Sequence, residues 1–404
     1  MKKLAGVLVL LLCAAGCLKP ASENEYQRTI TIWEQEDATV APFIDRLTES
    51  FRRLPGNENL IIKRVHYQVE DLRQQFQTAS ISGSGPDLII CPSDFGGVFS
   101  IAGFILPLND VFDMSRYEPK GVEAVTMDGK IWGVPVSVGN HLMLMYNKKF
   151  VSHAPQNTKE LFSYCDSKPA GLDYCLAFDA GEPFWLVPWL GAFGGWPIDG
   201  HKPVLNTPAM KSTLTFYMDL RKKKYMPLEC DYNCMDSLFK EEKVPFIICG
   251  DWAMSVYSDK LGSNFAVGRI PMVSETGRWP SPMVSGRYFM LSSRLKGKKL
   301  ALIKSFVEFY TNKENQLAQV RELKRLPGLA AASQDPAVKN NPLLMASLSQ
   351  VQVGRPMPMA TELRVVWDSA RQYVGNILNG KMQLDDGLVR MQKDAESKAE
   401  ELNR

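Results

Sequence analysis

Aromatic rings beside acidic side chains recur along this sequence. They occur as Trp33 with Glu34, Glu36 and Asp37; Glu182 with Phe184 and Trp185; Asp251 with Trp252; and Trp367 with Asp368 and Arg371. A sugar ring has apolar C–H faces that lie on flat aromatic rings, and its hydroxyl groups donate hydrogen bonds to carboxylate oxygens. Hydrogen bonds to a charged acceptor are stronger than neutral ones. The pattern therefore predicts a carbohydrate-binding cleft.

Several of these residues also have a purely structural explanation. Trp33 belongs to an expected strand and Trp367 lies on the apolar stripe of an expected helix, so both could be core residues. Asp94 could cap the helix that begins just after it. Glu182 is different, because the glycine before it and the proline after it predict a turn that presents ring and carboxylate together.

Motifs that would indicate a reaction are missing from the sequence. It contains no G-x-S-x-G, no H-E-x-x-H, no glycine-rich phosphate loop and no cysteine with an evident histidine partner. We therefore expect a binding protein that has no cofactor and is not an enzyme. Two alternatives stay open: a secreted glycoside hydrolase using a carboxylate pair such as Glu182 and Asp94, and a sugar-sensing receptor subunit that reports to a sensor kinase.

The elements that would position these residues follow an α/β pattern. Short apolar runs predict strands at residues 29–33, 61–65 and 87–91. Between them, pairs of apolar residues four positions apart predict helices. Alternation of strand and helix indicates a sheet with helices on its faces. Residues 244–249 predict a further buried strand, which ends just before Trp252.

The N-terminus reads as an export signal of the lipoprotein type. Two lysines follow Met1, an apolar run covers residues 4–12, and small residues precede Cys17. The apolar run is too short to span a bilayer. We expect cleavage after Gly16 and acylation of Cys17, with palmitate as one such acyl chain, so that the exported chain is held at a membrane surface in the periplasm or outside the cell. The alternative is cleavage near Ala15 without lipidation.

Size and charge narrow the possible partners. The chain has 404 residues, which is too long for one compact core and suits two domains. Its formal net charge is +3, and its main basic run, residues 221–224, is typical of a solvated helix end. Nucleic acid is therefore not an expected partner. Beyond the signal, no apolar segment approaches the length of a membrane span, which leaves Cys17 as the expected anchor.

The cysteines predict disulfides rather than a metal site. Outside the cytoplasm nearby cysteines oxidise, and the local candidates are Cys165 with Cys175 and Cys230 with Cys234. Sequence alone leaves the connectivity open. A metal site is not expected, because the chain has four histidines and none stands at ligand spacing from a cysteine pair.

The order of motifs resembles that of the extracellular solute-binding proteins of carbohydrate ABC importers, in particular the maltose and maltodextrin-binding branch. The likeness covers nearly the whole chain after the signal. It rests on residues 85–97, 129–136 with 146–148, 178–195, 211–227, 246–252, and 357–358 with 367–371.

This resemblance implies an α/β fold with two hinged lobes and a central ligand cleft. The implied division is residues 1–16 as the signal, 17–138 with 271–326 as the first lobe, and 139–270 with 327–404 as the second. The chain would cross between lobes near Gly139, Ile270 and Pro327. The implied partners are a carbohydrate and ABC permease subunits driven by a separate ATPase, and the protein would act as a monomer.

The resemblance also assigns ligand-binding roles to individual residues. Asp37 and Asp94 would bind hydroxyl groups from the first lobe. The second lobe would supply stacking and polar contacts from Glu182, Phe184, Trp252, Trp367 and Arg371. Secondary candidates are Glu36, Trp185 and Asp368.

Departures from the family pattern bear on specificity. Cys91 stands in place of a sugar-stacking tryptophan, Ala38 in place of a basic residue, and Gly139 in place of a glutamate near the hinge. Phe95 follows Asp94 directly, where an arginine would intervene. These changes remove ring surface and polar partners, so we expect a shorter or differently linked sugar than a long maltodextrin.

Overall fold

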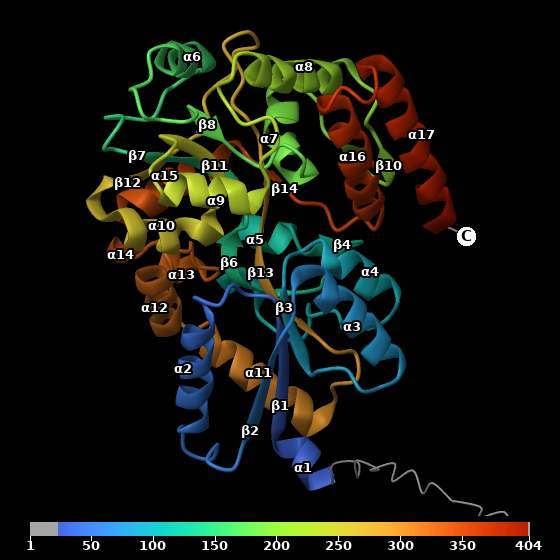
Figure 1. The fold of residues 1–404 in the computed structure, drawn as a ribbon. Helices are drawn as coiled ribbons and strands as arrows, with labels where there is room; N and C mark the ends of the chain where they lie inside the picture. Colours follow the sequence, from blue (N-terminus) through green and yellow to red (C-terminus); the bar gives the residue numbers. More distant parts are fainter. Residues whose placement is uncertain (1–22, 403–404) are drawn as a thin grey trace, which may run out of the picture.

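The computed structural model describes residues 23–402, so the predicted signal, Cys17 and the choice of cleavage site lie outside the described residues. The described chain is a mixed α/β structure with two main sheets stacked along its long axis (Figure 1). The α/β prediction is therefore confirmed. Within the described residues, no helix is long and apolar enough to cross a membrane.

The first sheet has strand order β14-β13-β3-β1-β2, and β6 also pairs with β13. Strand β1 runs parallel to both β2 and β3, whereas β13 is antiparallel to β3 and β6. The strands are β1 (Thr29–Glu34), β2 (Ile61–His66), β3 (Leu88–Cys91), β6 (Val134–Gly139), β13 (Met283–Leu291) and β14 (Arg355–Pro356).

Alternate residues of these strands feed two separate cores, one on each face of the sheet. Leu88 and Ile90 of β3 pack toward helices α2 (Ala41–Arg52) and α11 (Gly297–Tyr310). Ile89 and Cys91 pack on the other face toward α3 (Val69–Ile81) and α4 (Phe95–Ile101). Because both faces are covered, all four β3 residues are buried and the strand reads as a continuous apolar run.

Shorter elements complete the first lobe and its approach to the second. They are α1 (Glu23–Arg28), η1 (Met114–Arg116), α5 (Pro119–Glu123), the hairpin β4 (Thr126–Met127) and β5 (Lys130–Ile131), α12 (Lys313–Leu323), α13 (Ala330–Ser333) and α14 (Pro336–Lys339).

The second sheet has strand order β12-β7-β11-β8 and sits above the first in Figure 1. Its strands are β7 (Leu142–Asn147), β8 (Leu176–Ala177), β11 (Phe246–Gly250) and β12 (Phe265–Gly268). The surrounding elements are α6 (Thr158–Asp166), α7 (Pro183–Ala192), β9 (Ile198–Asp199), β10 (Lys202–Pro203), α8 (Pro208–Lys222), α9 (Tyr232–Lys240), η2 (Asp251–Ala253), α10 (Met254–Leu261), η3 (Gly262–Asn264), α15 (Pro342–Val353), α16 (Glu362–Leu378) and α17 (Leu384–Leu402).

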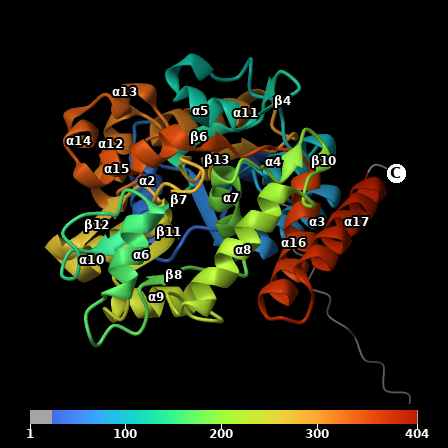
Figure 2. The same ribbon diagram turned by 90° about the horizontal axis from the view of Figure 1, so that it is seen from above.

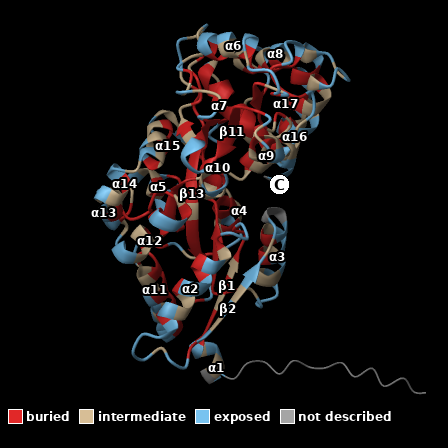
Figure 3. Ribbon diagram, turned by 60° about the vertical axis from the view of Figure 1, so that its left-hand side comes forward, coloured by how far each residue is buried: buried red, intermediate tan, exposed pale blue. Residues whose placement is uncertain are grey.

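Helix α7 runs through the middle of the second lobe. Its residues are apolar on every side, as expected of a buried helix, and burial colouring shows it inside a shell whose outer helices expose one face (Figure 3). Helices α16 and α17 pack side by side at the edge of this lobe, as both ribbon views show (Figures 1 and 2). Because α7 is buried along its length, its first turn, which carries Pro183 and Phe184, has a fixed position.

The first passage between the sheets is short and sterically demanding. Strand β6 ends at Gly139 and β7 begins at Leu142. Gly139 has a φ of 149°, and a Cβ added there would lie 1.9 Å from Oδ2 of Asp251. Both facts require glycine at this position, since other residues rarely adopt this conformation and a side chain would collide with the carboxylate.

The lobe boundaries given above, 17–138 with 271–326 and 139–270 with 327–404, remain a prediction, which we refine from core membership. Met283 at the start of β13 packs in the core of the second lobe, whereas Phe289 packs in the first-lobe core that lies against α2 and α11. Around the third passage the two cores interleave, because Val320 and Leu326 pack in the second-lobe core whereas Leu323 and Ala332 pack in the first-lobe core. We propose that the second passage lies between Met283 and Phe289, somewhat later than Ile270, and that the third lies within residues 320–338, which include Pro327.

The described chain holds a disulfide at each pair of cysteines singled out from the sequence. Cys165 joins Cys175, linking α6 to the residue before β8, and Cys230 joins Cys234 at the start of α9. Cys91 and Cys249 are free and buried.

A buried ion pair ties the N-terminal strands to α11. Lys299 Nζ lies 2.9 Å from Asp87 Oδ2, and their side chains are 2% and 9% exposed. The same ammonium donates to the carbonyl oxygens of Tyr26 and Thr29, and Asp87 accepts from the Thr31 amide at 2.8 Å. The pair therefore joins α11 to the start of β1 and to the residue before β3.

We predict that Lys299→Met destabilises the protein by about 3 kcal/mol, because it leaves the Asp87 carboxylate buried without a counter-charge. Chemical denaturation gives the free energy of unfolding. The double variant Lys299→Met with Asp87→Asn should lose clearly less, since no uncompensated charge remains. Equal losses in the single and double variants would contradict this role for the charge.

Candidate binding site

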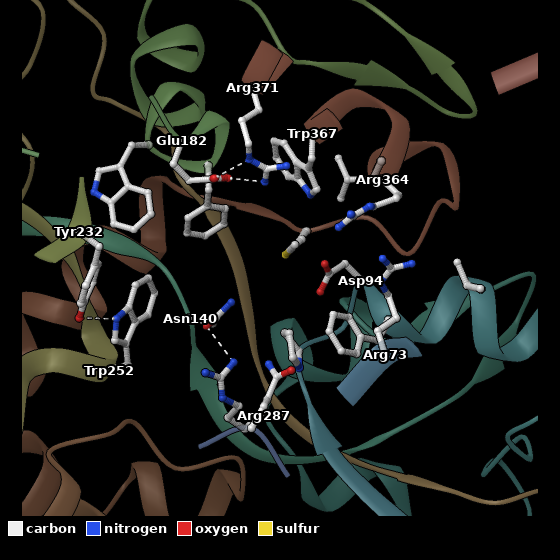
Figure 4. Close-up of a pocket in the computed structure, with 18 of the residues that line it drawn as sticks. Arg73, Asp94, Asn140, Glu182, Tyr232, Trp252, Arg287, Arg364, Trp367 and Arg371 are labelled. Carbon is white, nitrogen blue, oxygen red and sulfur yellow. Dashed lines mark hydrogen bonds and ion pairs between the residues drawn. The ribbon is translucent and has the colours of Figure 1, made fainter. Parts of the chain in front are cut away.

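A pocket of about 630 Å³ lies between the two lobes. This volume is typical of small-molecule sites. Its lining includes all seven residues that the sequence resemblance assigned to a ligand, together with the secondary candidate Trp185: Asp37, Asp94, Glu182, Phe184, Trp252, Trp367 and Arg371. Many of them appear in Figure 4. The structure thus brings together side chains that are more than 330 positions apart in the chain.

The second lobe contributes a wall of aromatic rings. The Phe184 ring centroid lies 6.4 Å from that of Trp252 and 6.4 Å from that of Trp367. Trp185 lies behind them, 6.2 Å from Trp252, and its indole Nε1 donates to the Ile248 carbonyl at 2.7 Å. Because neighbouring rings support one another in edge-to-face and tilted contacts, the wall keeps its shape.

Trp252 is held from two sides. It follows directly from β11, in the short helix η2, and its ring folds back over Gly250 so closely that a Cβ there would lie 2.0 Å from the indole. Its Nε1 donates to the Tyr232 hydroxyl at 3.2 Å, as drawn in Figure 4. Gly250 therefore makes room for the ring, and Tyr232 sets its rotation.

Helix α16 presents a row of alternating charges to the pocket. Arg364 pairs with Asp368 at 3.1 Å, and Asp368 pairs with Arg371 at 3.4 Å. Arg371 in turn binds both carboxylate oxygens of Glu182, at 3.0 and 3.2 Å. Spacings of three and four residues place these side chains on one helix face. The row fixes Glu182 at the pocket wall, while Asp368 supports it from outside the lining.

Glu182 and Asp94 both stand at the N-cap position of a helix, but neither side chain makes the capping hydrogen bond. The capping explanation for Asp94 is therefore not supported. Trp367 shows that core and site are compatible, since it is 8% exposed within the second core and still lines the pocket. Trp33, in contrast, packs against Tyr67 at 4.9 Å and does not belong to the described pocket lining.

The first lobe contributes polar groups from the loops that follow β1 and β3. Gln35 and Asp37 come directly after β1, and Asp94 comes after β3. Burial, followed by the neighbouring Glu36 carboxylate, raises the pKa of Asp37. These loops lie at the carboxyl ends of parallel strands, where ligands of α/β proteins bind.

Glu36 lies beneath this lining and not in it. Its carboxylate binds Arg287 Nε at 2.8 Å and Arg325 Nη1 at 2.7 Å, and the Glu36 side chain is 2% exposed. Burial alone would raise the pKa of Glu36, but the two guanidinium groups outweigh it and lower the pKa. Arg287 also donates to Asn140 at 3.1 Å. Glu36 thus supports the pocket floor, and we do not propose it as a direct ligand contact.

The sequence reasoning missed several lining residues. They are Gln35, Arg73, Asn140, Tyr232, Arg287 and Arg364, among others. Most stand alone in the sequence, with no pattern that marks them. Tyr232 is the exception, because it lies between the paired cysteines Cys230 and Cys234, and a ring held in so small a loop could have been noticed.

Aromatic rings on one side of an interlobe pocket and hydrogen-bonding groups on the other define a two-lobed solute-binding protein. The family model for bacterial extracellular solute-binding proteins matches residues 51–346, and the chain belongs to this family.

Individual relatives agree with this assignment. The solved maltose/maltodextrin-binding domain MalE from Bdellovibrio bacteriovorus, bound to maltotriose, is 34% identical, with a TM-score of 0.83, covering 92% of this chain and 99% of that one. A maltotriose-binding protein of Pyrococcus abyssi is 25% identical over 88% of this chain and 79% of its own length. A maltooligosaccharide ABC transporter solute-binding lipoprotein of Streptococcus pneumoniae is 23% identical over 92% of this chain and 90% of its own.

Asp179 is an ionisable residue next to the turn that carries Glu182. The Glu182 amide donates to Asp179 Oδ1 at 3.2 Å. Burial, followed by the charge of Glu182, raises the pKa of Asp179 from 3.8 to about 6. A pKa that is higher in the folded state means that the folded chain binds the proton more tightly than the unfolded chain. This contribution to stability is complete below pH 3.8 and is lost as the pH rises through about 6.

We predict that Asp179→Asn flattens the decline in stability between pH 4 and about 6.5, because an amide does not ionise. The free energy of unfolding, measured by urea denaturation across this range for both proteins, tests the prediction. Parallel curves for the two proteins would show that Asp179 does not carry this titration.

Proposed function

We propose that this chain is the solute-binding component of a sugar ABC importer, and that it captures a maltodextrin-type oligosaccharide in the interlobe pocket. The observation that carries the proposal is the aromatic wall of the second lobe facing carboxylates of the first across one pocket. The 34% identical relative, which was solved with maltotriose, supports the choice of sugar.

The geometry suggests how the sugar would be held. Rings of Phe184, Trp252 and Trp367 would cover the apolar faces of successive sugar units. Asp37 and Asp94 would accept hydrogen bonds from hydroxyl groups on the opposite side. A ligand that contacts both lobes binds the closed arrangement more tightly than an open one, so it shifts the protein toward the form that the permease would recognise.

The first-lobe side supports a preference for short chains. Cys91 is fully buried, with its Sγ 3.6 Å from the Met290 sulfur, and it offers no surface to a ligand. Ala38 lies outside the described lining. We therefore infer that sugar units beyond the reach of the second-lobe wall gain little binding energy, and that maltotriose is a suitable test ligand.

We infer that the protein does not hydrolyse its ligand. Inverting and retaining glycosidases need one carboxyl group that donates a proton to the leaving oxygen. Both Glu182 oxygens accept hydrogen bonds from Arg371, so this carboxylate is already engaged in a bidentate ion pair. A role as receptor subunit has no specific observation in its favour.

We further propose that the mature chain begins at acylated Cys17, palmitate being one such chain, and is anchored as a monomer at the outer face of a membrane. The predicted export signal ahead of the cysteine, the extracellular family and the lipoprotein relative of Streptococcus pneumoniae support this location.

We predict that Trp252→Ala weakens maltotriose binding about tenfold. If roughly 60 Å² of ring face is covered, about 25 cal/mol per Å² corresponds to ~1.5 kcal/mol. Isothermal titration calorimetry measures the change, and chromatography of the recovered sugar should find it intact.

Trp279→Ala is the matched control. Trp279 is half-buried beside Arg269 and lies outside the pocket lining, so its removal should leave the affinity unchanged. Equal affinities of the Trp252→Ala variant and the unmodified protein would reject the stacking role, and release of shorter sugars would favour the hydrolase.

We predict that Cys17→Ser moves the protein from the membrane to the soluble fraction, because the acyl chains that bind the bilayer are lost. Fractionation of expressing cells, with the variant and the unmodified chain side by side, measures the distribution. A soluble unmodified protein would support cleavage near Ala15 instead.

A further inference from the structure

The Cys230–Cys234 disulfide encloses a residue of the binding pocket. Tyr232 lies between the two cysteines and lines the pocket, while Cys230 and Cys234 do not. The bond closes a ring at the very start of α9, with the two Cα atoms 5.2 Å apart. The side chain of Asp231 accepts a hydrogen bond from the Cys234 amide at 2.9 Å and caps the same turn. Tyr232 is therefore held by a closed covalent loop and a helix cap.

Tyr232 transmits this constraint to the aromatic wall. Its hydroxyl accepts the Trp252 indole N–H at 3.2 Å, and its ring lies 6.2 Å from that of Trp185. Trp185 is already fixed by its bond to the Ile248 carbonyl. The Trp252 ring packs against the rings of Phe184 and Trp185 and over Gly250, and the hydrogen bond to Tyr232 orients its indole N–H.

Accessibility separates this disulfide from the other one. Cys165 and Cys175 are 5% and 0% exposed and lie within the second core. Cys230 and Cys234 are both half-buried, so this disulfide is the more exposed of the two. The free thiol of Cys249 contacts the Tyr232 hydroxyl and is buried, and this burial raises its pKa to about 12, so it is protonated at neutral pH.

We propose that the Cys230–Cys234 disulfide is a positioning element of the ligand site, which makes sugar affinity depend on the redox state of this one bond. This inference rests on the proposed function. The intact bond holds Tyr232 against Trp252 and keeps the indole flat to the sugar. After reduction the turn at the start of α9 gains freedom, the Tyr232–Trp252 bond is populated less, and the indole must be ordered by the ligand itself.

The chemistry needs only a dithiol as reductant. One thiolate of the dithiol attacks a sulfur of the disulfide, which releases the first protein thiolate and forms a mixed disulfide. The second thiol of the reagent then attacks the reagent's own sulfur in this mixed disulfide and releases the second protein thiolate. Two electrons and two protons pass to the protein, which gains two thiols, while the dithiol becomes a cyclic disulfide. Reoxidation reverses the exchange.

The test compares Cys230→Ala/Cys234→Ala with Cys165→Ala/Cys175→Ala as the matched control, using maltotriose and calorimetry. Loss of one ordering hydrogen bond corresponds to about fivefold weaker binding. We expect this loss for the Cys230/Cys234 variant and none for the control, although the buried control bond contributes to thermal stability. Treating the unmodified protein with dithiothreitol should reproduce the loss without any substitution.

A Trp252→Ala background separates positioning from general destabilisation. If the disulfide acts through Trp252, its removal in this background should change the affinity by less than about twofold, because coupled residues are not additive. An equal fivefold loss in both backgrounds would overturn the inference, as would an unchanged affinity of the Cys230/Cys234 variant. Failure of the unmodified, oxidised protein to bind maltotriose would overturn the proposed function and this inference with it.

Discussion

A buried carboxylate that needs two cations holds the pocket floor together. Glu36, Arg287 and Arg325 come from the loop after β1, from the middle of β13 and from the segment after α12. A carboxylate removed from water is costly unless it is paired, so these three segments have to meet. Their meeting places Gln35 and Asp37 on the pocket side and directs Arg287 toward Asn140 at the first passage between lobes. The same buried ion pairs therefore support both the pocket floor and the first connection between the lobes.

The strands, and the acidic and aromatic residues that line the pocket, have local signatures in the sequence. Strand β3 is visible in the sequence as a short apolar run, and Trp252 as a ring at the end of a buried strand. Arg73, Arg287 and Asn140 had no such signature, since their place in the pocket is set by pairings between distant segments. The assignment of Trp367 came from resemblance alone, as periodicity could indicate only that the residue is buried.

The apolar periodicity of a helix treats core residue and ligand-binding residue as alternatives, but a side chain can be both. Trp367 packs in the second core and lines the pocket, and Phe184 packs against the same core while facing Trp252. A stacking surface built from core residues is rigid, because each ring is supported by others behind it. Little conformational entropy is then lost when a sugar is bound.

The division of labour between the lobes has an evolutionary consequence. The aromatic lining of the pocket comes mainly from α7, η2 and α16 of one lobe, whereas Gln35, Asp37 and Asp94 come from the loops after β1 and β3 of the other. Mutations in these two loops can change which hydroxyl pattern is accepted while the general attraction for pyranose faces persists. Duplicated copies of such a gene can thus diverge toward new sugars through a few loop substitutions, without passing through a form that binds no sugar at all.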